Sequence, residues 1–438
     1  MVEEETLRYT VEPNIGSKIV MKTLPGGICT LHIEDEDDPI RSLKFFADQD
    51  GMTRFHVRPA IESDVIAKMV IDCEVEANIT RFPLELRSSP KPTPEMPAPP
   101  LERAVRRPNG ASVLPALSED DAFQLSDEEL LRRGYPPRPD PQKVPDAFGK
   151  WQRAFSLPLT FVEPKSVSNP GISHGPGHIS EGPGDRNSDT WSGFLLDHGN
   201  PFCVVTGVWN VPSVTGEYNM HTYSSFWVGL DGFHDKVTGI DVRGDLPQAG
   251  TEQQSLDLLF ESPTGRHLPF SFSIYYAWTQ FWDNQIFEQV VPNLHVNPGD
   301  EMYVGVWMGN EKSVIDLNGD CIFSLTNMTT RQSQLLSTSR DSKVVSGRLA
   351  DWIMERPTLN HGSPGSSSAD LANYNSATMV AYASGPPSPT GFGPAVWYSS
   401  KIPGHDNPQL TMKNGTKELS SVTQVNYGKM LFSWHAFH

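Results

Sequence analysis

Much of the chain alternates hydrophobic and polar residues with a period of two, which is the pattern of half-buried β-strands. In the first 88 residues, runs bounded by Gly, Pro and Asp clusters predict strands at 7–11, 18–21, 28–33 and 65–75. From residue 190 onward the same pattern predicts strands at 203–211, 224–230, 271–278, 301–307, 321–326, 349–355, 377–383 and 429–434. Strands do not alternate with helices in this region. We therefore expect a mainly β protein whose C-terminal region is a large antiparallel β-sandwich.

A proline-rich stretch, Ser89–Pro100, divides the two strand-rich regions. Its proline density excludes both a helix and a paired strand, and it predicts an extended linker. Two helical signals follow: a capping box formed by Ser126 and Glu129, and an amphipathic segment, Phe148–Phe155, that we expect to pack as an arm against the next domain. We predict three parts: a small β-rich accessory module or pro-region at 1–88, a Pro-rich linker with a short helix at 89–150, and the β-sandwich at 151–438.

Composition excludes several classes of function. A net charge of -18 over 438 residues leaves no basic footprint for a phosphate backbone, so no nucleic-acid partner is expected. No apolar run reaches the roughly 18 residues of a membrane-spanning helix, and the acidic N-terminus shows no signal peptide. The four cysteines lack metal-site spacing, and they allow either two disulfides, Cys29–Cys73 and Cys203–Cys321, or four free buried thiols.

Residues 171–175 read Gly-Ile-Ser-His-Gly, which formally matches the GxSxG motif of serine hydrolases. A nucleophile elbow needs a strand before the serine and a helix after it. Here Pro170 precedes the motif and Pro176 follows it, so the elbow is not expected. His174 and His178 are four residues apart, but no predicted helix aligns them as metal ligands. We assign no chemistry to this loop.

Seven short motifs follow one another in the second half of the chain. In order they are DTWSG (189–193), VWNVP (208–212), FWVGLDG (226–232), LPQAG (246–250), YAWTQFW (276–282), VNPGD (296–300) and ADWIME (350–355). This order closely resembles the glutamic peptidase family, the eqolisins, over about residues 190–383. The family's curved antiparallel β-sandwich, of concanavalin or jelly-roll shape, agrees with the strand pattern. The resemblance implies an acid-acting endopeptidase.

The resemblance places the family's catalytic glutamine at Gln248 and its catalytic glutamate at Glu355. Peptide hydrolysis needs a base for the attacking water, an acid for the leaving amine and a donor for the oxyanion. One glutamate can serve as base and then as acid, while a glutamine amide supplies a neutral N–H donor. A Gln/Glu dyad therefore contains the required groups.

Five further positions fall on residues of the family's cleft. Trp227 and Asp231 lie on the strand that lines the cleft near the dyad, and Glu252 takes the place of a family acidic residue. Trp278 and Gln280 belong to the YAWTQFW motif, in which Gln280 replaces a family glutamate. We expect these five residues to bind substrate, and we expect the replacement to alter recognition or pH response.

The resemblance implies no metal and no organic cofactor, a protein or peptide substrate and a secreted protein, although no signal peptide is visible. We also expect a monomer without a membrane partner. Two alternatives stay open. A non-catalytic module could bind glycan or peptide on the same concave face, with Gln280 marking lost activity. The chain could also be a zymogen with residues 1 to about 150 as the pro-region. The presence of both Gln248 and Glu355 favours an enzyme over the binding module.

Overall fold

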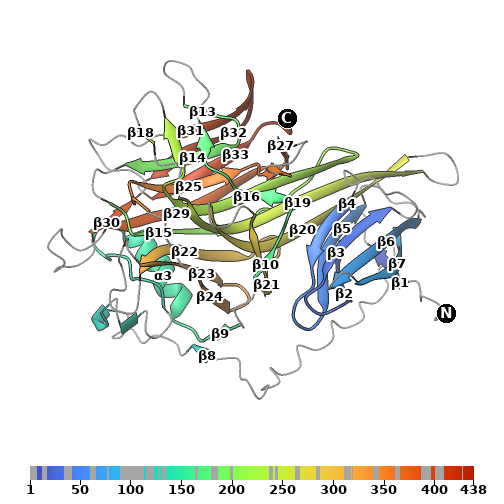
Figure 1. Ribbon diagram of the computed structural model, residues 1–438, viewed down its shortest axis with the longest axis horizontal. Coiled ribbons are helices and arrows are strands. Elements are labelled where there is room, and N and C mark those ends of the chain that lie inside the picture. Colours follow the sequence, from blue (N-terminus) through green and yellow to red (C-terminus); the bar gives the residue numbers. More distant parts are fainter. Residues whose placement is uncertain are drawn as a thin grey trace.

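Long antiparallel strands form two packed layers in the computed structural model of the protein (Figure 1). The structure describes residues 7–11, 17–33, 42–59, 66–75, 78–88, 113–114, 123–126, 129–130, 135–162, 166–178, 186–197, 201–235, 240–241, 245–261, 267–282, 287–309, 317, 319–338, 345–360, 366–385, 396–399, 409–426 and 428–438. The expected mainly β sandwich is confirmed.

The first layer runs across the sheet in the order β31 (Gln409–Asn414), β14 (Trp191–Asp197), β25 (Leu349–Glu355), β16 (Met220–Leu230), β19 (Pro247–Glu261), β20 (His267–Phe281), β21 (Gln289–His295) and β10 (Val167–Ser168). The second runs in the order β8 (Val113–Leu114), β9 (Leu159–Phe161), β24 (Gln332–Thr338), β23 (Asp320–Asn327), β22 (Glu301–Gly309), β15 (Val204–Asn210), β29 (Ser376–Gly385), β33 (Lys429–Trp434) and β32 (Lys417–Asn426). Strand β31 also pairs with β32, so it joins the two layers at one edge.

Several short strands pair with the long strands of the two layers. They are β13 (Asn187–Ser188) beside β31, β28 (Asp370–Leu371) beside β16, and β30 (Val396–Ser399) beside β29. Two small three-stranded sheets consist of β11 (Ile172–Ser173), β26 (Thr358–Leu359) and β27 (Ser367–Ser368), and of β12 (Gly177–His178), β17 (Phe233–Asp235) and β18 (Ile240–Asp241).

Successive side chains of a strand point to opposite faces of the sheet, so neighbouring residues of the first layer lie on different faces. Phe226, Val228 and Trp352 point into the core between the layers. Their neighbours Trp227 and Ile353 point the other way, into a second apolar cluster on the outer face. The first layer is therefore buried on both faces, and its outer face carries the motif residues.

Helix α3 (Pro145–Phe155) covers the outer face of the second layer, as Figure 1 shows at the lower left. Proline at the first helical position suits the helix start, where its missing N–H costs nothing. Trp151 is fully buried in a cluster with Val204 of β15 and Tyr382 of β29. The expected packing arm is present. The capping box is also present, with reciprocal bonds between the backbone N–H groups and side chains of Ser126 and Glu129.

The first 88 residues form a sheet of their own and also extend the first layer. The sheet has the order β1 (Leu7–Val11), β7 (Asn78–Ser88), β6 (Ile66–Val75), β3 (Ile28–Ile33) and β4 (Ser42–Phe46). Strands β2 (Ser17–Lys22) and β5 (Met52–Pro59) pair with each other, and β5 pairs with the distal half of β20. Core residues of both regions belong to one apolar cluster. The two predicted boundaries between the three parts stay predictions, and the proline-rich stretch lies outside the described residues.

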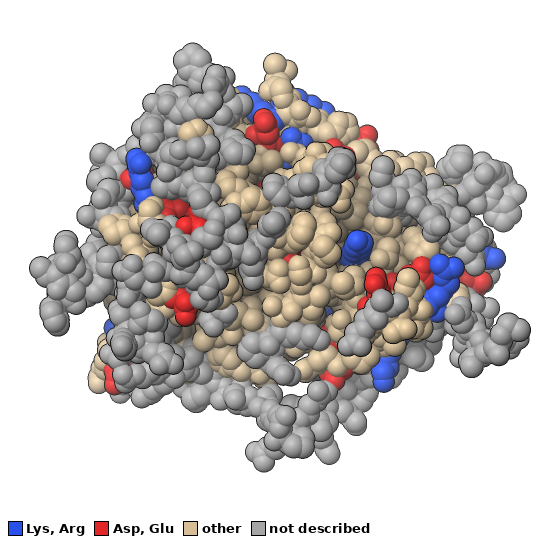
Figure 2. All heavy atoms as spheres, in the orientation of Figure 1, with Lys and Arg blue, Asp and Glu red and all other residues tan. Residues whose placement is uncertain are grey.

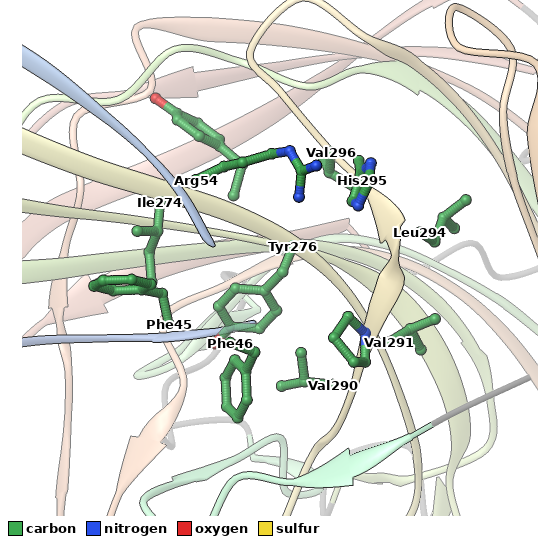
Figure 3. Close-up of a pocket in the computed structure, with 12 residues that line it drawn as sticks. Phe45, Phe46, Arg54, Ile274, Tyr276, Val290, Val291, Leu294, His295 and Val296 are labelled. Carbon is green, nitrogen blue, oxygen red and sulfur yellow. The ribbon is translucent and has the colours of Figure 1, made fainter. Parts of the chain in front are cut away.

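A small cavity of about 40 Å³ lies where this module meets β20 and β21 (Figure 3). Phe46 of the module packs edge-on against Tyr276, with ring centroids 5.9 Å apart. Asp48 accepts hydrogen bonds from Arg54 (2.9 Å) and from Nε2 of His295 (3.0 Å). The contact between the module and the sandwich is thus partly apolar and partly ionic.

The surface charges, the lengths of the helices and the state of the cysteines bear on the expectations drawn from composition. Charged side chains of both signs lie interspersed on the face seen in Figure 2. Within the described ranges, no helix has the length and apolarity to cross a membrane. All four cysteines are buried free thiols, so the second of the two cysteine alternatives is the one found.

Candidate active site

One row of residues crosses four strands on the outer face of the first layer. Glu355 of β25 lies opposite Ser225 of β16, Ser225 lies opposite Glu252 of β19, and Glu252 lies opposite Tyr276 of β20. Paired residues in adjacent strands point to the same face. The register therefore brings two carboxyl groups and a phenol, which the sequence separates, onto one side of the sheet.

A second row supplies two indole rings. Trp227 and Trp278 lie on either side of Gly250, which is their partner on β19. A Cβ atom at Gly250 would lie 2.2 Å from the carbonyl oxygen of Phe226, so only glycine fits between the two tryptophans. Gln248, two residues before this glycine, has the same parity and faces the same side.

Glu355 is almost fully buried at the end of β25. Its Oε2 accepts a hydrogen bond of 2.7 Å from Nε1 of Trp227, and Trp191 packs edge-on against that indole at 4.8 Å. Burial raises the pKa of Glu355, and the charge of His174 and the Trp227 hydrogen bond partly offset this effect. Such a carboxyl group takes up and releases protons at a higher pH than an exposed glutamate.

His174 connects the two predicted catalytic side chains. Its carbonyl oxygen accepts a hydrogen bond of 2.6 Å from Nε2 of Gln248, and its Nδ1 lies 3.0 Å from Oε2 of Glu355. Its backbone N–H donates to Oε1 of Gln280 at 3.0 Å. A residue of the chain itself thus lies on the dyad, with both its backbone and its side chain engaged.

The imidazole of His174 is enclosed on its remaining sides. Its Nε2 lies 3.0 Å from Oε2 of Glu288, and its ring stacks on Trp278 with 3.8 Å between centroids and 8° between planes. Burial disfavours the charged ring, but the charges of Glu355 and Glu288 outweigh burial and raise the pKa of His174 to about 10. The ring is therefore an imidazolium at neutral pH.

Two further carboxyl groups complete the cluster. Glu288 precedes β21, and its Oε1 accepts hydrogen bonds of 2.7 Å from the hydroxyl of Tyr276 and from Nδ2 of Asn169. Neither oxygen of Glu252 has a hydrogen-bond partner among the described residues, and the Ser225 hydroxyl opposite it donates to the carbonyl of Thr251 instead. Burial and the charge of Glu288 raise the pKa of Glu252 well above its usual range, which favours its protonated form.

His174, Glu252 and Glu288 each offer one ligand atom, and these atoms lie within 4.8 Å of one another. One imidazole nitrogen and two carboxylate oxygens form a donor set that suits zinc. However, both imidazole nitrogens are already paired with carboxylates. The cluster is therefore closed as an ion-paired network.

Asp231 does not join this cluster. It follows β16 in a turn with φ of 64°, and its carboxylate accepts hydrogen bonds from Gly347 N (2.8 Å), Ser346 Oγ (2.8 Å) and Leu349 N (3.1 Å). These bonds hold the start of β25, the strand that ends in Glu355. The contacts lie at the start of β25, at the opposite end of that strand from Glu355.

The other predicted site residues gather in one place. They are Gln248, Glu355, Trp227, Glu252, Trp278 and Gln280. Sequence reasoning missed His174 and Glu288. His174 lies in the loop that was assigned no chemistry, before the region that resembles the family, and Glu288 belongs to none of the motifs. His174 appears in the sequence only within the rejected GxSxG match and the His174/His178 spacing, and no sequence pattern includes Glu288.

Comparison with known proteins finds a match between residues 189–397 and the Peptidase A4 family. Among solved structures, Scytalido-glutamic peptidase with a peptide-based transition state analog is 17% identical, with a TM-score of 0.40, over 56% of this chain and 98% of that one. SCP-B, an eqolisin-family peptidase in complex with the tripeptide Ala-Ile-His, is 18% identical, with a TM-score of 0.39 and the same coverage. No curated protein matches the chain.

Proposed function

We propose that this chain, whose residues 189–397 belong to the Peptidase A4 family of glutamic peptidases, is an acid-acting endopeptidase that uses Gln248 and Glu355. The family match supports the coarser statement that the domain is a peptidase. One observation carries the finer one. Gln248 Nε2 donates a hydrogen bond of 2.6 Å to the backbone carbonyl oxygen of His174, and the imidazole of His174 also contacts Glu355.

The proposed chemistry assigns one role to each side chain. The Gln248 amide N–H stabilises the oxyanion that forms when water adds to the carbonyl carbon. Ionised Glu355 takes a proton from that water and then gives it to the leaving nitrogen as the C–N bond breaks. A buried glutamate with a raised pKa suits this double role at mildly acid pH.

The surrounding residues would hold an extended peptide. Gln280 accepts a hydrogen bond from the backbone N–H of His174, and Gln248 donates one to its carbonyl. The two side-chain amides therefore bind both backbone groups of one residue. These hydrogen bonds to a peptide backbone resemble those that form when a peptide adds as a strand to the edge of a sheet. The Trp227 N–H fixes the Glu355 oxygen that would receive the proton. These contacts favour a protein or peptide substrate.

The two alternatives fare differently. A non-catalytic peptide binder would also use the hydrogen bonds of Gln248 and Gln280 to a peptide backbone, and the presence of both Gln248 and Glu355 favours the enzyme. The zymogen alternative gains support, because His174 engages both members of the dyad. The segment that reaches the dyad lies after residue 150, outside the region first expected to be the pro-region.

Digestion of an unfolded protein between about pH 3 and pH 7, with a pepsin-type inhibitor present, tests the proposal. New peptides are expected from the parent chain at acid pH. If neither the parent nor a chain with His174 replaced releases peptides anywhere in that range, the proposed activity is wrong.

A further inference from the structure

The His174 ring occupies a place whose shape and polar groups match it closely. One flat face lies against Trp278 at 3.8 Å, and a carboxylate oxygen lies 3.0 Å from each ring nitrogen. A planar ring with N–H donors on both sides is what this arrangement accommodates. An ammonium group could pair with the carboxylates, but it has no face to stack on the indole.

Each strand that packs around the His174 ring contributes an acidic side chain or a phenol, and together these groups favour a positively charged ring. They are Glu355 of β25, Glu252 of β19, Tyr276 of β20 and Glu288 before β21. All are buried, and within the described residues His174 is the cation that faces them. A positive ring on an indole face also gains cation–π energy.

In the occupied site, Oε2 of Glu355 and the Gln248 N–H group that the proposed reaction uses are already engaged. Oε2 of Glu355 already accepts from Trp227 and contacts Nδ1 of His174, so the ring stands where an attacking water would bind. The Gln248 amide is engaged by the His174 carbonyl. Substrate hydrolysis requires that both contacts be released.

We propose that Trp278, Glu288 and Glu355 form a binding site for an imidazolium group, that the chain fills it with its own His174, and that this occupancy inhibits the dyad. Ligands with a protonated imidazole compete for the same place. The inhibitory part rests on the proposed peptidase function, whereas the binding part does not.

Backbone contacts hold the segment that carries His174 independently of the ring. Asn169 N donates to the carbonyl of Glu288 (3.0 Å), and Glu288 N donates to the carbonyl of Ile172 (3.2 Å). Ile172 also pairs with Leu359 of β26. Removal of the ring alone should therefore open a cavity of imidazole shape, with the backbone contacts of the segment still present but the segment released from the dyad more often than in the parent.

His174→Gly creates this cavity, and free imidazole at near-neutral pH is the probe. We expect the variant to cleave a test peptide about tenfold faster than the parent, since couplings of this kind span 5- to 150-fold. Imidazole should slow the variant toward the parental rate and raise its Tm by a few degrees through binding to the folded state. Pyrazole, a neutral isomer of the same shape, should do neither. His221→Gly is the matched control, because His221 is a second stacked histidine and lies against Tyr223.

The outcomes separate the two proposals. Cleavage without any effect of imidazole on rate or Tm would overturn the inference and leave the peptidase intact. A rise in Tm without cleavage at any pH would support the binding site and reject the peptidase. If His174→Gly does not fold, Glu288→Gln decides, because it weakens the hold on His174. Faster cleavage near neutral pH would then support the inference, and a parental rate would overturn it.

Discussion

Nδ1 of His174 lies 3.0 Å from Oε2 of Glu355, although 181 positions separate the two residues in the chain. This contact couples the segment that follows β11 to the proposed catalytic carboxylate. The charge of the ring favours ionised Glu355, and the charge of Glu355 favours the protonated ring. Stability, pH response and activity should therefore change together when either residue is altered.

The pKa of His174, raised to about 10 from 6.5, predicts how stability depends on pH. A raised pKa gives stability that is fully present below pH 6.5 and is lost as pH rises toward 10. Chemical denaturation of the parent and of His174→Gln should show a difference in unfolding free energy that shrinks over this window by a few kcal/mol. Burial lowers the pKa of His221 to about 4, so His221→Gln should show no such change there. A constant difference for His174→Gln would contradict the ion pair.

Trp227→Phe replaces the indole with a smaller aromatic ring and removes the N–H that donates to Glu355 at 2.7 Å. Loss of a donor to the charged form should raise the pKa of Glu355 further. The limb of kcat/KM that rises with pH should therefore move up by about one pH unit. Trp307→Phe is the control, since Nε1 of Trp307 is buried without a hydrogen-bond partner among the described residues. Equal profiles for the two variants would rule out this role of Trp227.

Gln280→Glu places a carboxylate where Oε1 of Gln280 accepts the His174 N–H. An added negative charge should raise the pKa of Glu355 and strengthen the hold on the His174 imidazolium. We expect the rising limb of kcat/KM to move to higher pH and the rate near neutrality to fall, so that the active window narrows. A profile superimposable on the parental one would show that position 280 is electrostatically remote from Glu355.

Limited proteolysis should cut first in the proline-rich stretch at 89–100, because such a sequence cannot form paired structure. The released N-terminal fragment should stay bound, since β5 pairs with β20 and both regions share an apolar cluster. Size-exclusion chromatography with mass spectrometry of the peaks provides the measurement. First cuts inside Lys18–Val75, or separation of the fragments in native buffer, would contradict this account.

The sequence predicts those strands whose apolar residues alternate cleanly. Residues 7–11, 28–33, 349–355 and 429–434 coincide with β1, β3, β25 and β33. It misses β19, one of the longest strands, because the face of β19 that lines the site carries Gln248, Glu252 and Gln254 instead of apolar residues. The hydrophobic pattern thus fails where function requires polar groups inside.

Some residues of the candidate site could be predicted from the sequence, and others could not. The motifs mark Gln248 and Glu355 because each lies on a strand whose register is set by neighbouring strands. His174 reaches Gln248, Gln280 and Glu355 across 74, 106 and 181 positions, and Glu288 belongs to none of the motifs. No local pattern records such contacts, so the occupied state of the dyad is visible only in the folded chain.

The rate at which Glu355→Gln and Gln248→Ala digest an unfolded protein at acid pH tests the central claim most directly. It should be measured in the parent and in the His174→Gly background, with circular dichroism to verify folding. Loss of a catalytic acid/base or of an oxyanion donor should lower the rate by roughly 10²-fold or more. Glu418→Gln, at an exposed position of β32, and Gln334→Ala, in the second layer, should keep parental rates. A folded Glu355→Gln chain that digests as fast as its parent would contradict the assignment.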